Sequence, residues 1–218
     1  MKHIVHVLEA TAGGTLRHVR ELSGALNPKR FKQTLVLKNS PAWEQDAPAT
    51  FFISMAHEIS PWKDFIAFIK LTRMLGQLKP DIVHAHSSKA GALARMACAV
   101  LRVPCVYTPH AFSFLDTTLS KKRRAFYRTV EKFLARFTSV LIAVSREEAR
   151  ITREKLGLQE ARVRLIPNGV RLPTNDERRT ASEVASRSSE VGSPKSSPSS
   201  DATRRKRGWT FFCKRWCC

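Results

Sequence analysis

Histidine, serine and lysine side chains gather in two short segments of the sequence, HAHSSKAG at residues 84–91 and TPHAF at residues 108–112. Each segment begins at the end of a short apolar run, residues 81–85 or 105–107, that is typical of a buried parallel strand. In parallel sheets, ligands bind beyond the carboxyl ends of the strands. We therefore expect one crevice to be lined by His86, Ser87, Ser88, Lys89 and His110.

A second candidate site lies near the amino terminus, where Gly13 and Gly14 stand between a predicted strand at residues 3–8 and a predicted helix. Glycine lets the backbone approach a phosphate closely, and the free amides and dipole of a helix start favour an anion. Arg17 and His18 are close enough to add charge. The same two glycines suit any tight turn between a strand and a helix, so the pattern alone leaves both interpretations open.

Strand and helix patterns alternate along residues 1–172, which predicts an α/β fold with a single doubly wound, Rossmann-like parallel sheet. The predicted strands are residues 3–8, 31–38, 50–55, 81–85, 105–107, 139–144 and 162–166. Helices are predicted after Gly14, at residues 62–78, 90–101 and 120–137, and from Ser145 to Gly157. Ser145 and Glu148 form a capping box at the start of the last of these helices.

Two predicted helices have patterns that bear on function. The apolar stripe of the helix at residues 62–78 includes Trp62, Phe65 and Ile66, and we expect most of it to be core. The helix at residues 120–137 (SKKRRAFYRTVEKFLARF) is strongly basic and amphipathic. It either lies on an anionic membrane or exposes a solvated basic face of the domain.

The composition indicates an anionic partner. A formal net charge of +20 over 218 residues attracts phosphate-bearing ligands, an acidic membrane surface or nucleic acid, and charge alone does not choose among them. Cys98 and Cys105 fall in predicted elements and are expected to be buried. The spacing of the cysteines indicates neither a disulfide framework nor a zinc motif, so no metal site is predicted. The first residues, MKHIVHVLEA, do not form a signal peptide, which favours a cytoplasmic location.

The character of the sequence changes after Pro173. Residues 182–200 are rich in serine and poor in large apolar side chains, so residues 173–218 are expected to be a disordered Ser/Arg-rich tail. Residues 1–172 then form the folded domain. A change of reading frame near Pro173 would account for the jump in composition, and an intact continuation in another frame of the gene would support that hypothesis.

Five segments in this order resemble the amino-terminal half of family 4 glycosyltransferases, retaining enzymes of GT-B fold: HVLEATAGGTLRHVRELSGAL, KPDIVHAHSSKAGALARMA, VPCVYTPHAFSF, SVLIAVSREE and VRLIPNGV. The resemblance covers about residues 1–172. The HAHSSKAG form is similar to members that extend lipid-linked oligosaccharides or exopolysaccharide repeat units in bacteria. The resemblance implies the acceptor-side half of a GT-B fold and transfer of a sugar from a nucleotide-sugar to a lipid-linked saccharide acceptor in cell-envelope synthesis.

The resemblance also implies roles for individual residues. His110 matches the histidine that reaches the transferring sugar and is the catalytic candidate. The acceptor- and phosphate-binding candidates are Gly13, Gly14, Arg17, Ser87, Ser88 and Lys89, of which Lys89 suits a pyrophosphate-linked acceptor. A structural role is expected for His84, His86, Ser145 and Glu148.

In family 4 a second domain supplies the basic pair and the glutamate motif that grip the nucleotide-sugar, and no such pattern follows Pro173. A single domain forms only one side of the cleft and does not align donor with acceptor. We therefore expect a truncated enzyme that transfers sugar poorly by itself. The resemblance implies no cofactor and no metal ion, with the nucleotide-sugar as donor substrate.

Two alternatives remain open at this point. In the first, the chain is the acceptor-binding subunit of a split transferase, and a separate partner supplies the donor domain. In the second, it is a non-catalytic basic module that binds membrane or nucleic acid. The sequence contains no recognition motif or aromatic stacking platform for nucleic acid, so nucleic-acid binding is not expected. Peripheral attachment to the inner face of the plasma membrane fits the glycosyltransferase interpretation, because a lipid-linked acceptor resides there.

Overall fold

The computed structural model describes residues 1–9, 13–38, 48–55 and 59–169. Contacts divide the chain into two units, Met1–Arg171 and Leu172–Cys218, and the first contains all of the described elements. The predictions made for the tail and for the boundary at residue 172 lie outside the described residues.

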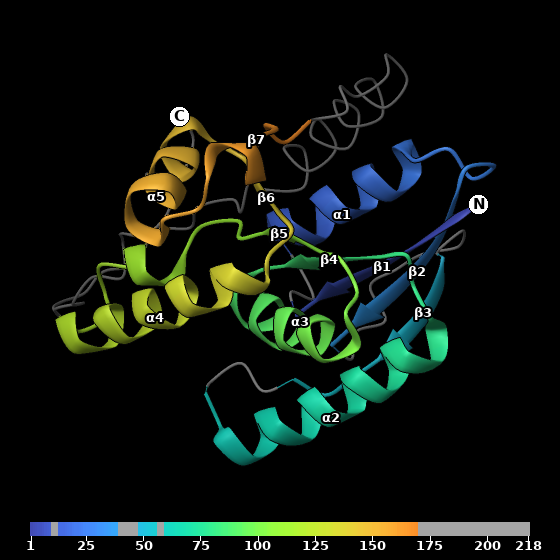
Figure 1. Ribbon diagram of the computed structural model, residues 1–218, viewed down its shortest axis with the longest axis horizontal. Helices are drawn as coiled ribbons and strands as arrows, with labels where there is room; N and C mark the ends of the chain where they lie inside the picture. The colour runs from blue at the N-terminus through green and yellow to red at the C-terminus, as the bar shows by residue number, and fades with distance from the viewer. Residues whose placement is uncertain (10–12, 39–47, 56–58, 170–218) are drawn as a thin grey trace, which may run out of the picture. The chain divides into compact units, whose positions relative to one another are not determined.

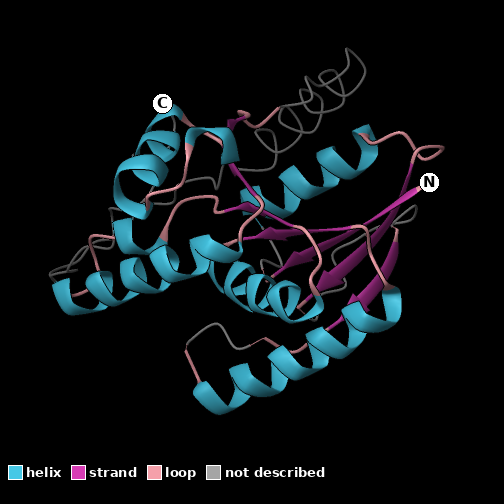
Figure 2. Cartoon of the chain, in the orientation of Figure 1, coloured by secondary structure: helices cyan, strands magenta, loops and turns pink. Residues whose placement is uncertain are grey.

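Seven parallel strands form one sheet in the order β3-β2-β1-β4-β5-β6-β7 (Figures 1 and 2). The strands are β1 (Lys2–Leu8), β2 (Phe31–Leu37), β3 (Ala49–Phe52), β4 (Ile82–His86), β5 (Cys105–Thr108), β6 (Val140–Ala143) and β7 (Val163–Leu165). The helices between them are α1 (Gly13–Ala25), α2 (Pro61–Leu78), α3 (Ser88–Leu101), α4 (Lys121–Leu134) and α5 (Arg146–Leu156). Short 3-10 turns occupy Ser113–Leu115, Ala135–Phe137 and Glu160–Arg162. The predicted doubly wound parallel sheet is confirmed.

The central strand β1 lies between β2 and β4, and every residue of β1 after Lys2 is buried. The chain proceeds from β1 towards β3 on one side and from β4 towards β7 on the other, so the order reverses between β1 and β4. In open α/β sheets this switch point is where ligands bind. The register pairs His6 with His84 and Leu8 with His86, which brings histidines of both strands to this position.

Two separate groups of apolar side chains fill the space on either side of the sheet, and Figure 1 shows α1 on the opposite face from α2 and α3. The smaller group lies under α1 and consists of Leu8, Leu16, Val19, Leu35 and Leu37. The larger group packs α2, α3 and α5 against the central strands and includes Leu71, Leu93, Tyr107, Leu141 and Ile151. Both faces of the central strands are therefore covered, which is why their sequences are nearly continuous apolar runs.

The prediction that most of the α2 stripe is core is wrong for its first turns. The residues of α2 that are buried are Ala67, Leu71 and Leu75, whereas Trp62 is 72% exposed and Phe65 is 55% exposed. A helix turns about 100° per residue, which places Trp62 and Phe65 on the side of α2 away from the buried line. The apolar residues of α2 therefore form two faces, one packed and one open to solvent.

Cys98 and Cys105 are buried free cysteines, as predicted. Within the described part of the chain, none of the helices has both the length and the hydropathy that crossing a bilayer requires.

Candidate functional site

The carboxyl end of β4 leads directly into α3 through Ser87. Ser87 has φ +67°, a left-handed conformation that costs a residue with a side chain about 1–3 kcal/mol and is concentrated at functional sites. Its backbone N–H donates to the carbonyl of Thr108 at the end of β5 (3.1 Å). Its Oγ is buried and has no hydrogen-bond partner in the structure. The turn thus joins the ends of two neighbouring strands and leaves one buried hydroxyl at this position.

His110 lies in the loop after β5, where two successive residues adopt positive φ: His110 at +52° and Ala111 at +78°. Glu148 holds this loop in place. Its Oε1 accepts a hydrogen bond from the N–H of Ala111 (3.0 Å), and its Oε2 accepts one from the N–H of Val144 (2.7 Å). One carboxylate therefore ties the loop after β5 to the loop after β6.

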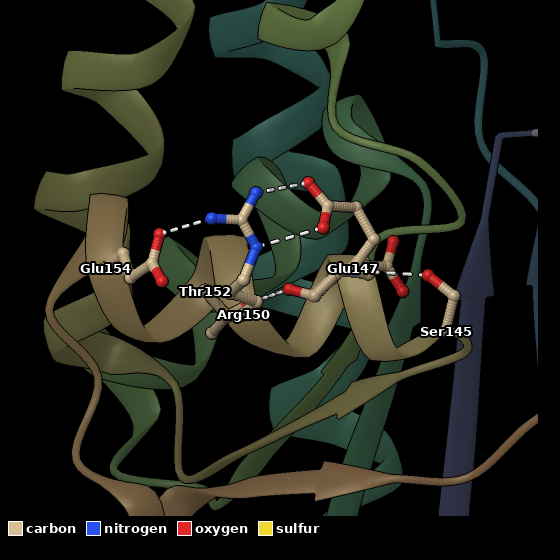
Figure 3. A network of polar contacts seen from close by, with 6 residues as sticks. Ser145, Glu147, Arg150, Thr152 and Glu154 are labelled. Carbon is tan, nitrogen blue, oxygen red and sulfur yellow. Dashed lines mark hydrogen bonds and ion pairs between the residues drawn. The ribbon is translucent and has the colours of Figure 1, made fainter.

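Glu148 is in turn fixed by the start of α5, which Figure 3 shows together with the ion pairs on the outer side of that helix. Ser145 Oγ accepts a hydrogen bond from the N–H of Glu148 (3.1 Å), which confirms the serine half of the predicted capping box. The glutamate half differs, because Glu148 Oε2 accepts a hydrogen bond from the N–H of Val144, the residue before Ser145. Glu147 and Glu154 pair with Arg150 on the exposed surface. The first turn of α5 consequently points one glutamate inward, to the His110 loop, and its neighbour outward.

Five histidines form a cluster and come from β1 (His6), α1 (His18), β4 (His84 and His86) and the loop after β5 (His110). His86 is at the centre: its Nε2 lies 3.4 Å from His6 Nδ1, and its Nδ1 lies 3.3 Å from His110 Nε2. The ring of His18 meets that of His110 edge-on, with centroids 4.8 Å apart. His84 is anchored separately, with its Nε2 2.8 Å from Thr108 Oγ1.

Burial keeps these rings neutral at pH 7. Desolvation lowers the pKa of His6 and of His110 to about 4, because the protein interior disfavours the charged imidazolium. It also holds the pKa of His84 and of His86 well below the ordinary value for histidine, and neighbouring histidines lower both further. Desolvation lowers the pKa of His18 as well. At neutral pH the cluster therefore offers nitrogen lone pairs and N–H donors rather than positive charge.

The glycine turn and the His110 loop meet in space. Gly13 opens α1 with φ +82°, and neither it nor Gly14 has heavy atoms near the position of an added Cβ, so the backbone is accessible there. His18, one turn further along α1, contacts the ring of His110. Arg17 beside it is exposed. The glycine start of α1 and the His110 loop are therefore neighbours in space.

Lys89 forms an ion pair at the start of α3. Its Nζ lies 2.9 Å from Asp64 Oδ1 in the first turn of α2, and both side chains are mostly buried. This pair joins α2 to the start of α3.

A buried polar network below the crevice was missed by sequence analysis. Arg95 of α3 forms an ion pair with Glu131 of α4 (2.9 Å), Tyr107 donates to the other oxygen of Glu131 (3.1 Å), and Arg95 lies over the Tyr107 ring. Gly91 leaves room for that ring, because an added Cβ would lie 2.3 Å from Tyr107 Cε2. An arginine on an otherwise ordinary helix gives no sign of burial, since its partner is far away in sequence.

Comparison with known proteins gives a consistent result. The family model described as Glycosyltransferase Family 4 matches residues 12–172. An Escherichia coli UDP-Gal:alpha-D-GlcNAc-diphosphoundecaprenol alpha-1,3-galactosyltransferase is 36% identical over 144 residues, which are 64% of this chain and 37% of that protein. The O-antigen biosynthesis glycosyltransferase WbnH of the same organism is 25% identical over 159 residues, 72% of this chain and 45% of that protein.

Solved structures share the fold. Anabaena Alr3699/HepE, in complex with UDP and glucose, superposes with a TM-score of 0.64 at 18% identity, over 85% of this chain and 50% of that one. Sucrose-phosphate synthase from Thermosynechococcus elongatus gives the same TM-score and identity over 84% of this chain and 53% of that one. This chain spans half or less of the length of the curated relatives named above. It belongs to glycosyltransferase family 4.

Proposed function

We propose that residues 1–169 form the acceptor-side half of a retaining glycosyltransferase that transfers a sugar from a nucleotide-sugar to a lipid-linked saccharide acceptor. The observation that carries the proposal is the contact between His18 and His110, because it brings the glycine start of α1 and the strained His110 loop into one crevice. The name of the E. coli galactosyltransferase supports a diphosphate-linked lipid as the acceptor class.

In this proposal, the imidazole of His110 hydrogen-bonds a hydroxyl group of the transferring sugar. Because burial lowers the pKa of His110 to about 4, the ring is neutral at pH 7 and acts as a hydrogen-bond partner rather than as a general acid. Its position is set by the loop that Glu148 anchors. A donor fixed before substrate arrives stabilises charge that develops as the glycosidic bond breaks. The step uses no metal ion.

The acceptor diphosphate would lie at the amino terminus of α1. Gly13 and Gly14 leave the backbone amides there accessible, and the helix dipole favours an anion. The exposed guanidinium of Arg17 adds a positive charge on the next turn. Ser87 supplies a buried hydroxyl without a partner on the other side of the crevice. Lys89, which is paired with Asp64, has a smaller part in this arrangement.

We also propose that the protein works on an anionic membrane surface, where a lipid-linked acceptor is found. Trp62 and Phe65 are exposed at the start of α2, and Lys121, Lys122 and Arg123 are exposed at the start of α4. A hollow of about 610 Å³ between α4 and α5 adds a further basic surface, lined by Arg128, Thr129, Lys132, Phe133, Arg136, Glu154 and Lys155. Aromatic side chains enter the bilayer interface, and basic side chains are attracted to anionic lipid.

The test measures transfer from a panel of radiolabelled nucleotide-sugars to a diphosphate-linked lipid acceptor in bacterial membranes, with the chain and its His110→Ala variant. Where a separate donor domain in the membranes supports transfer, we expect the variant to lose about 100-fold in rate, the effect of removing one preorganised hydrogen-bond donor. His3→Ala is the matched control, because His3 contacts Leu78 and Thr34 and lies outside the histidine cluster.

A second arm uses the purified chain and a soluble, short-chain diphosphate-linked acceptor, with binding measured by calorimetry. Arg17→Ala should weaken this binding, and Arg73→Ala, an exposed substitution on α2, should not. Transfer by His110→Ala at the wild-type rate would disprove the role of His110. If no transfer is measured in the membrane assay and the purified chain does not bind the acceptor, the acceptor-side function itself is rejected.

A further inference from the structure

The nitrogen atoms of His18, His86 and His110 are spaced like the ligands of a metal ion. One nitrogen from each ring lies within 4.8 Å of the other two. Two ring nitrogens of this group, His86 Nδ1 and His110 Nε2, are 3.3 Å apart. Two nitrogens bound at the usual length to a tetrahedral zinc ion are separated by about 3.3 Å, so this pair already has the required spacing.

His86 is oriented by its second nitrogen. Its Nε2 lies 3.4 Å from Nδ1 of His6, a residue that is only 1% exposed. When Nε2 carries the proton and donates to His6, the lone pair of His86 is on Nδ1 and faces His110. Histidine ligands of metal sites commonly donate their other N–H to a fixed acceptor in this way, which sets both the tautomer and the ring angle.

The outer three histidines suit an ion better than the inner group of His6, His84 and His86, whose nitrogens also lie within 4.8 Å of one another. The inner rings are buried, and His84 Nε2 already contacts Thr108 Oγ1 at 2.8 Å. His18 and His110 are only half-buried, so an ion can enter between them. Three ligands with an open side leave a fourth position for water.

The chemistry of the three side chains is also suitable. Imidazole nitrogen is a preferred ligand of zinc, nickel and copper ions.

We propose that His18, His86 and His110 form a binding site for a divalent transition-metal ion of the zinc type, and that the bound ion blocks transfer. The ion would take Nε2 of His110, the nitrogen that faces Nδ1 of His86, and so hold the ring beside His86 instead of at the sugar. The blocking effect rests on the proposed function; the binding itself does not. No spacing motif indicated this site, because its ligands come from α1, β4 and the loop after β5.

The test titrates Co²⁺, a spectroscopic substitute for Zn²⁺, into the full-length chain in which Cys213, Cys217 and Cys218 are replaced by serine, so that the terminal thiols do not compete. We expect visible absorption bands that saturate at one ion per chain and disappear on addition of Zn²⁺ or a chelator. His18→Ala and His110→Ala should each weaken binding by more than the roughly 10- to 100-fold that loss of an outer-shell partner costs. His3→Ala should leave it unchanged.

Circular dichroism of each variant establishes that it is folded. His18 and His110 are only half-buried, so we expect both alanine variants to fold. Wild-type chain without the visible bands, or equal binding by both variants and wild type, would overturn the proposal. In the membrane transfer assay, Zn²⁺ should inhibit the wild type and a chelator should restore it. If the chain shows no transfer under any condition, the cobalt titration still decides whether the site exists.

Discussion

Glu148 is the residue on which the geometry of the His110 loop depends most directly. Its two oxygens accept hydrogen bonds from backbone N–H groups of two different loops, and its own N–H is capped by Ser145. Burial raises the pKa of Glu148, and the two donated hydrogen bonds oppose that rise. The residue is therefore a positioning group: it holds His110 without facing the crevice itself.

Glu148→Gln should destabilise the fold and loosen the His110 loop. Glutamine has one side-chain oxygen, so one of the two N–H groups loses its acceptor, at a cost of about 1–3 kcal/mol in the free energy of unfolding. Urea unfolding measures the loss. The NMR signals of the His110 ring should also shift, which a general loss of stability would not produce.

Glu147→Gln is the matched control, because Glu147 is the adjacent residue and its carboxylate pairs only at the surface with Arg150 (Figure 3). Exposed ion pairs contribute little to stability, so this variant should unfold like the wild type. If both variants behave alike, Glu148 has no special role in placing the loop.

Helices α3 and α4 are joined by charge as well as by apolar packing. Arg95 and Glu131 are almost completely buried, and the carboxylate also accepts the hydroxyl of Tyr107. A buried ion pair is not a strong source of stability by itself, because each charge gives up its hydration. Removal of only one of the two charges is costly, because the other charge is then left without a partner in the interior.

Arg95→Met should lower the free energy of unfolding by about 3–5 kcal/mol, the usual effect of leaving a buried charge without its partner. The double variant Arg95→Met, Glu131→Gln removes both charges and keeps an acceptor for Tyr107. It should be more stable than the single variant. Chemical denaturation of the wild type, both single variants and the double variant gives the coupling directly, and equal stability of Arg95→Met and the double variant would contradict this account.

For the molecule as a whole, membrane binding combines two surfaces. Trp62→Ser with Phe65→Ser should reduce co-flotation with vesicles of anionic phospholipid, because the helix start loses its apolar side chains. The second double variant, Lys121→Glu with Lys122→Glu, should also reduce co-flotation at low salt, since each basic side chain near an anionic surface contributes about 1 kcal/mol. Val100→Ser, which alters an exposed apolar residue on α3, is the control. Flotation that is unchanged in both double variants would exclude these surfaces.

Much of the fold was predictable from sequence because its signals are local. Short apolar runs followed by polar residues marked β4 and β5, and the histidines at their ends marked the crevice. The wrong prediction, for α2, has a physical cause: apolar residues lie on more than one side of that helix, so periodicity does not single out the face that packs.

The missed parts of the site depend on contacts between distant segments. His6 and His86 are adjacent only because β1 pairs with β4, and His18 contributes only because α1 crosses above the same strand ends. Arg95 looks like a surface residue until Glu131, 36 residues further on, is placed beside it. Such pairings follow from the order of the strands rather than from any spacing in the sequence.

The same strand order has a consequence for biosynthesis. β1 is synthesised first. One of its two neighbours in the sheet, β4, follows much later, because Ile82, the residue of β4 that pairs with Ile4, lies 78 residues further along the chain. At ribosomal speeds of about 5–20 residues per second, roughly 4 to 16 s pass before that neighbour has been synthesised. During this interval a strand that is destined for complete burial has one open edge. Until β4 has emerged, this open edge is a place where the nascent chain can pair with a strand of another molecule.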